Sequence, residues 1–225
     1  MSSTLMAGAY EKLRRKLESG ELAPGAQLVN RKLGEELGVS TVTLREAIHR
    51  LTSEGLVEHI PNAGAFVRKL SRREVTELYK VRNALEMLAL DEAFARIDEE
   101  QLAELQQICD DWRKLARSIR KSEHQALEGE FNQRWIANDI KFHRILVDAA
   151  DNVWLKKVIA DLHLTSRIAR TKPAITNLSD AAKTYRMHVG ILRALRKRDL
   201  NQARSWMTYH NTVGLADARQ QAFEG

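Results

Sequence analysis

One carboxylate and three histidines in the second half of the chain are the residues best suited to metal chemistry. Asp139 and His143 are four residues apart, a spacing that puts both side chains on one face of a helix. His188 and His210 follow in two later helical stretches, so three helices could bring four ligands together. Neutral imidazoles bind borderline metals, and a carboxylate offsets part of the ionic charge. The set indicates a divalent transition-metal site, although independent, hydrogen-bonded histidines would show the same spacing.

A second group of residues, in the first third of the chain, suits contact with DNA. Ser40, Thr41, Thr43 and Arg45 gather at the start of a helix expected over residues 41–54. Hydroxyl groups can bond phosphates or base edges, and an arginine can make a forked pair with guanine or hold a phosphate. A solvated helix face would carry the same arginine, so the interpretation depends on the elements around it.

Those elements form a recognisable order. A short helix over residues 30–37, a Gly-Val-Ser turn and the helix over residues 41–54 precede two short strands joined by a turn at residues 61–64. Gly38 can take the left-handed conformation that ends the first helix, while Asn30 and Ser40 are expected N-caps. The order is that of a helix-turn-helix with a β wing, whose second helix enters the major groove with its N-terminal end.

The rest of the chain reads as helical, and no strand is expected after residue 68. Ser71 and Glu74 form a capping box that opens the first helix of this part. We therefore expect a mainly α protein with a winged helix-turn-helix DNA-binding domain in residues 1–70. An antiparallel all-α bundle of about six helices is expected in residues 71–225. Further helices are expected over about 98–119, 123–150, 152–170, 178–198 and 199–210.

Composition limits the classes of protein that the chain can represent. Its 225 residues carry 29% charged side chains and a net charge of +6. Residues 1–73 hold 12 Lys and Arg against 8 Asp and Glu, so most of the excess lies where phosphate attraction would need it. No apolar run approaches the ~18 residues of a membrane helix. The single cysteine, Cys109, fits a reducing cytoplasm.

A longer pattern runs through the first part of the chain. Its residues are Tyr10 to Leu13, the turn at residues 20–25, Leu33 to Leu37, Val39, Ser40, residues 43–48, Leu51, residues 55–57 and Gly64. In these residues the chain resembles the GntR family of bacterial transcription regulators. The resemblance implies that Arg31 and Arg45 contact DNA and that Asn62 and Gly64, at the wing tip, reach the minor groove. Relatives usually carry Arg and Pro where this chain has Thr41 and Thr43, so its operator sequence is expected to differ.

A second pattern runs through the helical part, in residues 81–86, 138–143, 151–152, 188–195, Asp199 and 207–210. In these residues the chain resembles the FCD ligand-binding domain of the FadR-type branch of that family. The resemblance implies that Asp139, His143, His188 and His210 hold a metal, commonly zinc or nickel, beside a cavity for a small carboxylate effector. The complete ligand set argues against a fatty-acyl-CoA sensor.

Two further residues are candidates for holding the effector. Arg82 occupies the position of an arginine common in that cavity and would pair with the effector carboxylate; an exposed ion pair with Glu86 is the alternative. Asn152 is a second candidate contact, with a helix N-cap as its alternative. The remaining histidines fit no ligand spacing and are interpreted as surface or local residues; they are His49, His59, His124 and His163.

These expectations combine into one function. The chain is expected to be a homodimeric transcription regulator, most often a repressor in this family, whose operator affinity responds to a small organic or sugar acid. It would act in the bacterial cytoplasm, at the nucleoid. The alternatives are an architectural DNA-binding dimer with a purely structural metal and a metal-dependent hydrolase. The second is disfavoured because no further residue is placed as a general base, and no enzymatic activity is expected.

Overall fold

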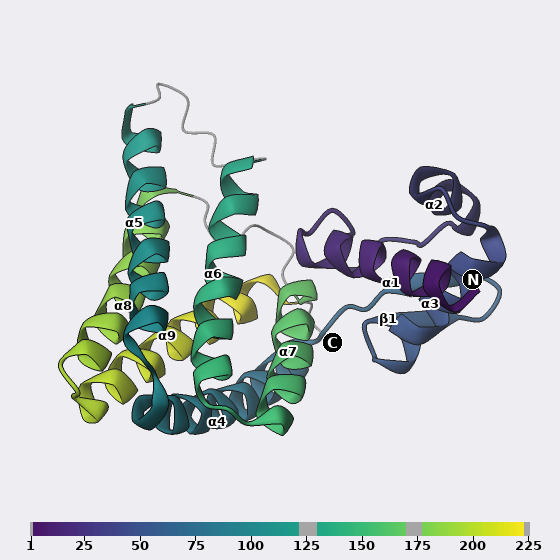
Figure 1. The fold of residues 1–225 in the computed structure, drawn as a ribbon. Coiled ribbons are helices and arrows are strands. Elements are labelled where there is room, and N and C mark those ends of the chain that lie inside the picture. The colour runs from purple at the N-terminus through teal and green to yellow at the C-terminus, as the bar shows by residue number, and fades with distance from the viewer. Residues whose placement is uncertain (1, 122–129, 170–176, 223–225) are drawn as a thin grey trace. The chain divides into compact units, whose positions relative to one another are not determined.

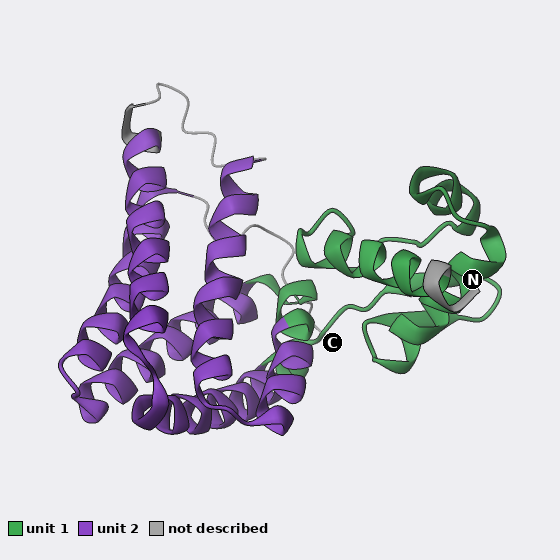
Figure 2. Ribbon diagram, in the orientation of Figure 1, with its two compact units in different colours: residues 1–75, 164–171, 221–225 green, residues 76–163, 172–220 purple. Residues whose placement is uncertain are grey.

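The computed structural model describes residues 2–121, 130–169 and 177–222 (Figure 1). The chain divides into two compact units (Figure 2). Unit 1 consists of Met1–Val75, Leu164–Thr171 and Gln221–Gly225, and unit 2 consists of Thr76–His163 and Lys172–Gln220. The described residues are mainly helical, as predicted. Among them, no helix combines the length and the apolar character needed to cross a membrane.

Unit 1 contains the predicted winged helix-turn-helix. Its elements are α1 (Ser2–Glu18), α2 (Asn30–Leu37), α3 (Thr41–Ser53), β1 (Val57–Ile60) and β2 (Gly64–Val67). The helix α3 packs against both α1 and α2, and its end meets β1. Leu13, Leu44 and Leu51 are fully buried in the core between these elements. Burial of one face of α3 leaves its opposite face exposed to solvent.

The boundaries of α2 and α3 have local chemical causes. Gly38 ends α2 in the left-handed conformation, with a φ of 67°. Ser40 caps α3, as predicted, because its Oγ accepts a hydrogen bond from the Thr43 amide at 3.1 Å. The predicted N-cap role of Asn30 is wrong. The helix begins at Asn30 itself, with Val29 at the cap position and no side-chain cap bond.

The wing is a small antiparallel sheet in which Val57 pairs with Val67 and Ile60 pairs with Gly64. A third segment, which the sequence interpretation assigns to no strand, adds to its edge. Backbone hydrogen bonds join residues 25–28 to β2, and Gln27 bridges Phe66. The wing is therefore anchored on the side opposite β1.

The described residues of unit 2 form mainly six helices, in agreement with the predicted number. Glu74 and Ser71 form the predicted capping box at the start of the first of them, with the Ser71 amide donating to Glu74 at 2.9 Å. The expected start of a long helix near residue 123 lies outside the described residues. The helices are α4 (Arg72–Arg96), α5 (Glu99–Lys121), α6 (Glu130–Ala149), α7 (Val153–Ile168), α8 (Leu178–Arg196) and α9 (Leu200–Gln221).

Aromatic side chains fill the middle of unit 2. The helix α5 packs against α6 and α8 (Figure 1), and Trp112, Trp135 and Phe142 are buried where these helices meet. A close approach of α8 and α9 depends on Gly190. A Cβ atom built at Gly190 would lie 2.3 Å from the ring of Trp206, so only a residue without a side chain fits there.

Candidate metal centre and candidate DNA-reading surface

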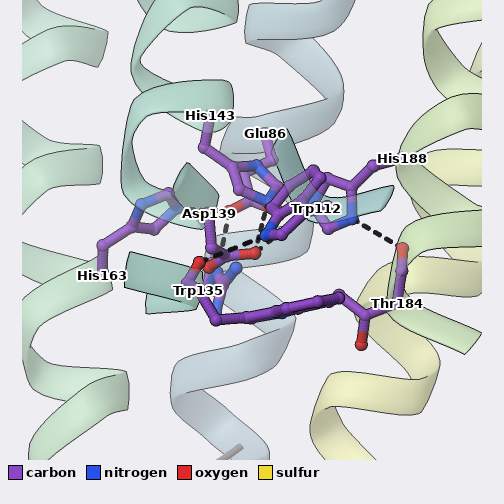
Figure 3. Close-up of polar contacts among 9 residues, drawn as sticks. Glu86, Trp112, Trp135, Asp139, His143, His163, Thr184 and His188 are labelled. Carbon is purple, nitrogen blue, oxygen red and sulfur yellow. Dashed lines mark hydrogen bonds and ion pairs between the residues drawn. The ribbon is translucent and has the colours of Figure 1, made fainter. Parts of the chain in front are cut away.

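The four residues selected as metal ligands come together in unit 2. Asp139 and His143 lie on α6, His188 on α8 and His210 on α9. One ligand atom from each lies within 4.8 Å of the ligand atoms of the other three. Figure 3 shows Asp139, His143 and His188 converging on one region. Three imidazoles and one carboxylate, from α6, α8 and α9, thus lie close together.

His188 is held in one orientation and one tautomer. Its side chain is fully buried, and its ring lies 4.5 Å from the Trp112 ring and 4.7 Å from the Phe142 ring, measured between centroids. His188 Nδ1 is 2.8 Å from the backbone carbonyl of Thr184, which can only accept a hydrogen bond (Figure 3). Nδ1 therefore carries the hydrogen, and Nε2 presents its lone pair to the cluster.

The nitrogens that face the cluster lack hydrogen-bond partners. Asp139 Oδ1 lies 3.3 Å from His188 Nε2 and 3.9 Å from His143 Nε2. Even so, no group among the described residues is in hydrogen-bond geometry with His143 Nε2, His188 Nε2 or His210 Nδ1. Unsatisfied buried nitrogens cost free energy, and a divalent cation among them would accept all three lone pairs. This donor set fits a borderline transition metal.

Burial also keeps two of these histidines ready to bind a cation. It lowers the pKa of His143 to about 3 and lowers the pKa of His210 well below its ordinary value. The cause is desolvation, because the charged imidazolium is disfavoured away from water. Both rings are therefore neutral near pH 7, which is the form that coordinates a metal.

A second polar group adjoins the four residues. Glu86, on α4, is 3% exposed, and it accepts hydrogen bonds from Arg82 at 2.7 Å and from His163 on α7. Burial alone would raise the pKa of Glu86, but the Arg82 charge and the His163 hydrogen bond outweigh it and lower the pKa well below its ordinary value. The His163 ring also packs edge-on against His143, 5.4 Å between centroids.

His163 is a residue that the sequence interpretation placed with the surface or local histidines. It joins the site through Glu86, which lies 77 residues earlier in the chain. Helical spacing relates only residues on one helix, so no local pattern links α4 to α7. The second set of side chains able to share a cation, Glu86, His143 and His163, was missed for this reason.

The two residues selected as effector contacts already have partners. Arg82 forms the ion pair with Glu86 that was the alternative, but the pair is buried, with side-chain exposures of 11% and 3%. Asn152 is the N-cap of α7, since its Oδ1 accepts from the amides of Trp154 and Leu155 at 3.2 and 3.1 Å. Its amide group donates to Glu92. In the structure Asn152 therefore has the helix-cap role that was its alternative.

The residues selected as DNA contacts lie on the exposed side of α3 or beside it. Thr41 and Arg45 are exposed, and Thr43 is partly buried. The hydroxyls of Ser40 and Thr43 are 2.9 Å apart and bond each other. Ser40 and Thr43 thus serve the start of the helix, while Thr41 and Arg45 face solvent.

The two candidate arginines differ in their surroundings. Arg31 on α2 pairs with Glu35 at 3.1 Å, an exposed contact of small energetic weight. Arg45 makes no ion pair or hydrogen bond with any described residue. It lines a depression of about 330 Å³ together with the start of α2, with His59 and with Gly64 of the wing. An unpaired guanidinium beside a concave surface suits an anionic partner.

The wing tip takes a conformation that two residues allow. Asn62 and Gly64 have positive φ angles of 62° and 106°, as a tight hairpin requires. Gln27 Nε2 donates to the Ala63 carbonyl at 2.7 Å and so fixes the tip from the third segment of the sheet. No local pattern points to Gln27, because its partner lies 36 residues further on.

Two family models match the chain. The description "Bacterial regulatory proteins, gntR family" matches residues 5–67, and the FCD domain matches residues 77–212. The first range covers the helix-turn-helix and the wing, and the second covers all four metal-ligand candidates. Both ranges agree with the resemblance read from the sequence.

Relatives and solved structures agree with these matches. An uncharacterised HTH-type transcriptional regulator of Streptomyces ambofaciens is 32% identical over 89% of this chain and 79% of its own length. The HTH-type transcriptional repressor RspR of Escherichia coli is 28% identical over 89% of this chain and 83% of its own. The structure of McbR/YncC from E. coli shares the fold, with a TM-score of 0.82, 22% identity and coverage of 96% and 98%. These relatives are named as transcription regulators and not as enzymes.

Proposed function

This chain belongs to the GntR family of bacterial regulatory proteins and carries an FCD domain. On that basis we propose that it is a homodimeric repressor whose affinity for its operator is controlled by a small organic or sugar acid bound at a metal site. Membership of the family implies DNA binding and transcription regulation. Our proposal adds that the chain represses transcription, binds a metal and responds to an effector. The protein would act in the bacterial cytoplasm, on operator DNA at the nucleoid.

The DNA contacts would come from the exposed side of the winged unit. Arg45 would hold a guanine edge or a phosphate, and Thr41 would bond a phosphate or a base. Arg31 would add a phosphate contact, and Asn62 and Gly64 would bring the wing to the minor groove. Ser40 and Thr43 would contribute mainly by fixing the first turn of α3, since their hydroxyls bond each other.

The observation that carries the effector half of the proposal is the convergence of Asp139, His143, His188 and His210 within 4.8 Å. These residues would hold zinc or nickel. The bound metal would act as a Lewis acid that attracts a carboxylate.

Arg82 and Glu86 would set the charge of this site. Arg82 donates its Nε to Glu86, so an effector carboxylate would meet a guanidinium that already has one partner. An effector at the metal would favour one arrangement of the chain over another only if it bound the two unequally. Asn152 would act on this site indirectly, through the start of α7 that it caps.

Exposed apolar side chains on two helices of unit 2 support the homodimer. Val81 and Leu88 on α4 are 51% and 44% exposed, while Val153 and Trp154 on α7 are 77% and 73% exposed. Tryptophan is enriched among the residues that dominate binding energy at protein interfaces. Two copies paired through the bundle would present two winged units to the two half-sites of an operator.

The proposal is tested by thermal unfolding of the full chain loaded with zinc or nickel. Small carboxylic acids are added one at a time, with neutral sugars as the negative set. We expect at least one acid to raise Tm, and we expect the rise to vanish in the double variant His143→Ala, His188→Ala.

If metal binds and no acid changes Tm across a broad panel, the effector half is wrong. The alternative function, an architectural DNA-binding dimer with a purely structural metal, would then be favoured. If an acid raises Tm but leaves operator affinity unchanged, the ligand is bound without regulating DNA binding.

A further inference from the structure

The first turn of α3 carries an apolar side chain that the fold itself does not use. Val42 is 65% exposed, more than any other large hydrophobic side chain described in unit 1. A β-branched residue loses rotamer freedom in a helix, and an exposed one gains little from burial. Neither helix formation nor packing therefore favours valine at this position.

The neighbours of Val42 define what it can contact. Ser40 and Thr43 bond each other and cap the helix, so their hydroxyls are used locally. Val42 and Arg45 are three residues apart and both exposed, which places them on one side of α3 near its N-terminal end. The outward surface of the first turn is thus one hydroxyl at Thr41, one apolar group and one unpaired cation.

In a helix-turn-helix protein the N-terminal residues of the recognition helix contact base edges in the major groove. Thymine presents its 5-methyl group there, and apolar side chains contact that methyl. We propose that Val42 packs against a thymine methyl in each operator half-site and so selects A·T pairs at that position. This inference rests on the proposed function, because it requires sequence-specific operator binding.

The size of the effect follows from the surface involved. Removing one methyl group from an apolar contact is expected to weaken binding about three- to fivefold for each half-site. The effect would be independent of salt, since no charge changes. Loss of Arg45, in contrast, would change both the affinity and its salt dependence. The two contributions can therefore be separated in one set of titrations.

The experiment begins with selection of duplex DNA from a random pool by the full-length protein. Each thymine of the selected sequence is then replaced by deoxyuridine, which lacks only the methyl group. Dissociation constants are measured by fluorescence anisotropy for the native protein and for Val42→Ala. Val158→Ala serves as the matched control, because Val158 is an exposed valine on α7, outside unit 1.

We expect one thymine in each half-site at which deoxyuridine weakens native binding. We expect that penalty to disappear in Val42→Ala and to persist in Val158→Ala. A penalty that persists in Val42→Ala, or the lack of any sensitive thymine, would overturn the role of Val42 while leaving operator binding intact. A selection that returns no preferred sequence would instead reject sequence-specific binding, and the inference with it.

Discussion

The candidate sites of the two units hold their side chains in opposite environments. On α3, Thr41, Val42 and Arg45 are exposed, and Arg45 has no partner among the described residues. In unit 2, His143 and His188 are 2% and 0% exposed and are fixed by packing against other rings. A surface that meets a large polyanion needs uncommitted groups, whereas a site for a small cation needs groups that are already desolvated and oriented.

The difference has a consequence for mutation. The exposed side chains on α3 can change with little effect on the fold, because few contacts depend on them. Changes around the histidine cluster alter both the site and the stability of unit 2, because the same residues serve packing and ligand geometry.

The double variant His143→Ala, His188→Ala removes two of the four proposed metal ligands. We expect bound zinc or nickel to fall from about one ion per chain to near zero, since the remaining groups cannot form a closed site. Elemental analysis after gel filtration measures this. His49→Ala, which removes an exposed histidine of α3, should leave the metal content unchanged. Full metal retention in the double variant would refute the cluster as a metal site.

Glu86→Gln removes the buried charge that balances Arg82. The pair is 11% and 3% exposed, and leaving a buried cation without its partner is expected to cost about 3–5 kcal/mol of the free energy of unfolding. Denaturant titration of the full chain gives this value. Asp91→Asn breaks the more exposed Arg204–Asp91 pair and should have a much smaller effect. Equal effects of the two changes would mean that Glu86 is not held as the structure has it.

Gly190→Ala tests the close packing of α8 on α9 that brings His188 and His210 together. The new Cβ would lie 2.3 Å from the Trp206 ring, so overpacking is expected to destabilise unit 2 by about 1–3 kcal/mol. Thermal unfolding reports the change. Gly8→Ala in α1 meets no atom within 4 Å and should be neutral or slightly stabilising. Opposite signs for the two glycines would support the packing of α8 against α9.

Arg45→Ala is expected to act on binding and not on stability. Loss of one phosphate or guanine contact should weaken operator affinity by about 1–3 kcal/mol. For a phosphate contact, the slope of log K against log salt should also fall by about one. Titration at several salt concentrations measures both. Arg50→Ala is the control on the same helix, because Arg50 is already paired with Glu54 at 3.1 Å. Unchanged binding would show that α3 does not carry the contact.

Local pattern predicted the winged unit in most of its detail. The capping Ser40, the left-handed Gly38 and the hairpin at Asn62 are signals that act over three or four residues, so they can be read from the chain directly. One failure there was local and one was not. Asn30 begins α2 instead of capping it. The third segment of the wing was missed because it pairs with residues far along the chain.

The helical part was predictable in a different way. Hydrophobic periodicity predicted the approximate bounds of the helices. The spacing of Asp139 and His143 predicted that these two of the four clustered residues share a helix face. The link from His163 to Glu86 was not predictable, since it joins α7 to α4 across 77 residues. The burial of the Arg82–Glu86 pair was missed for a related reason: spacing shows that two residues can meet and does not show whether water remains beside them.

The order of the elements could be predicted from the amino-acid sequence, because caps, turns and periodicity are set by neighbours along the chain. The class of the protein and the four candidate ligands followed from the resemblance to the GntR family and the FCD domain. The orientation of His188 Nε2, the pairing of Arg82 and the capping role of Asn152 became known only from the folded structure. Orientation, burial and partnership arise from the packing of distant helices, and no local pattern encodes them.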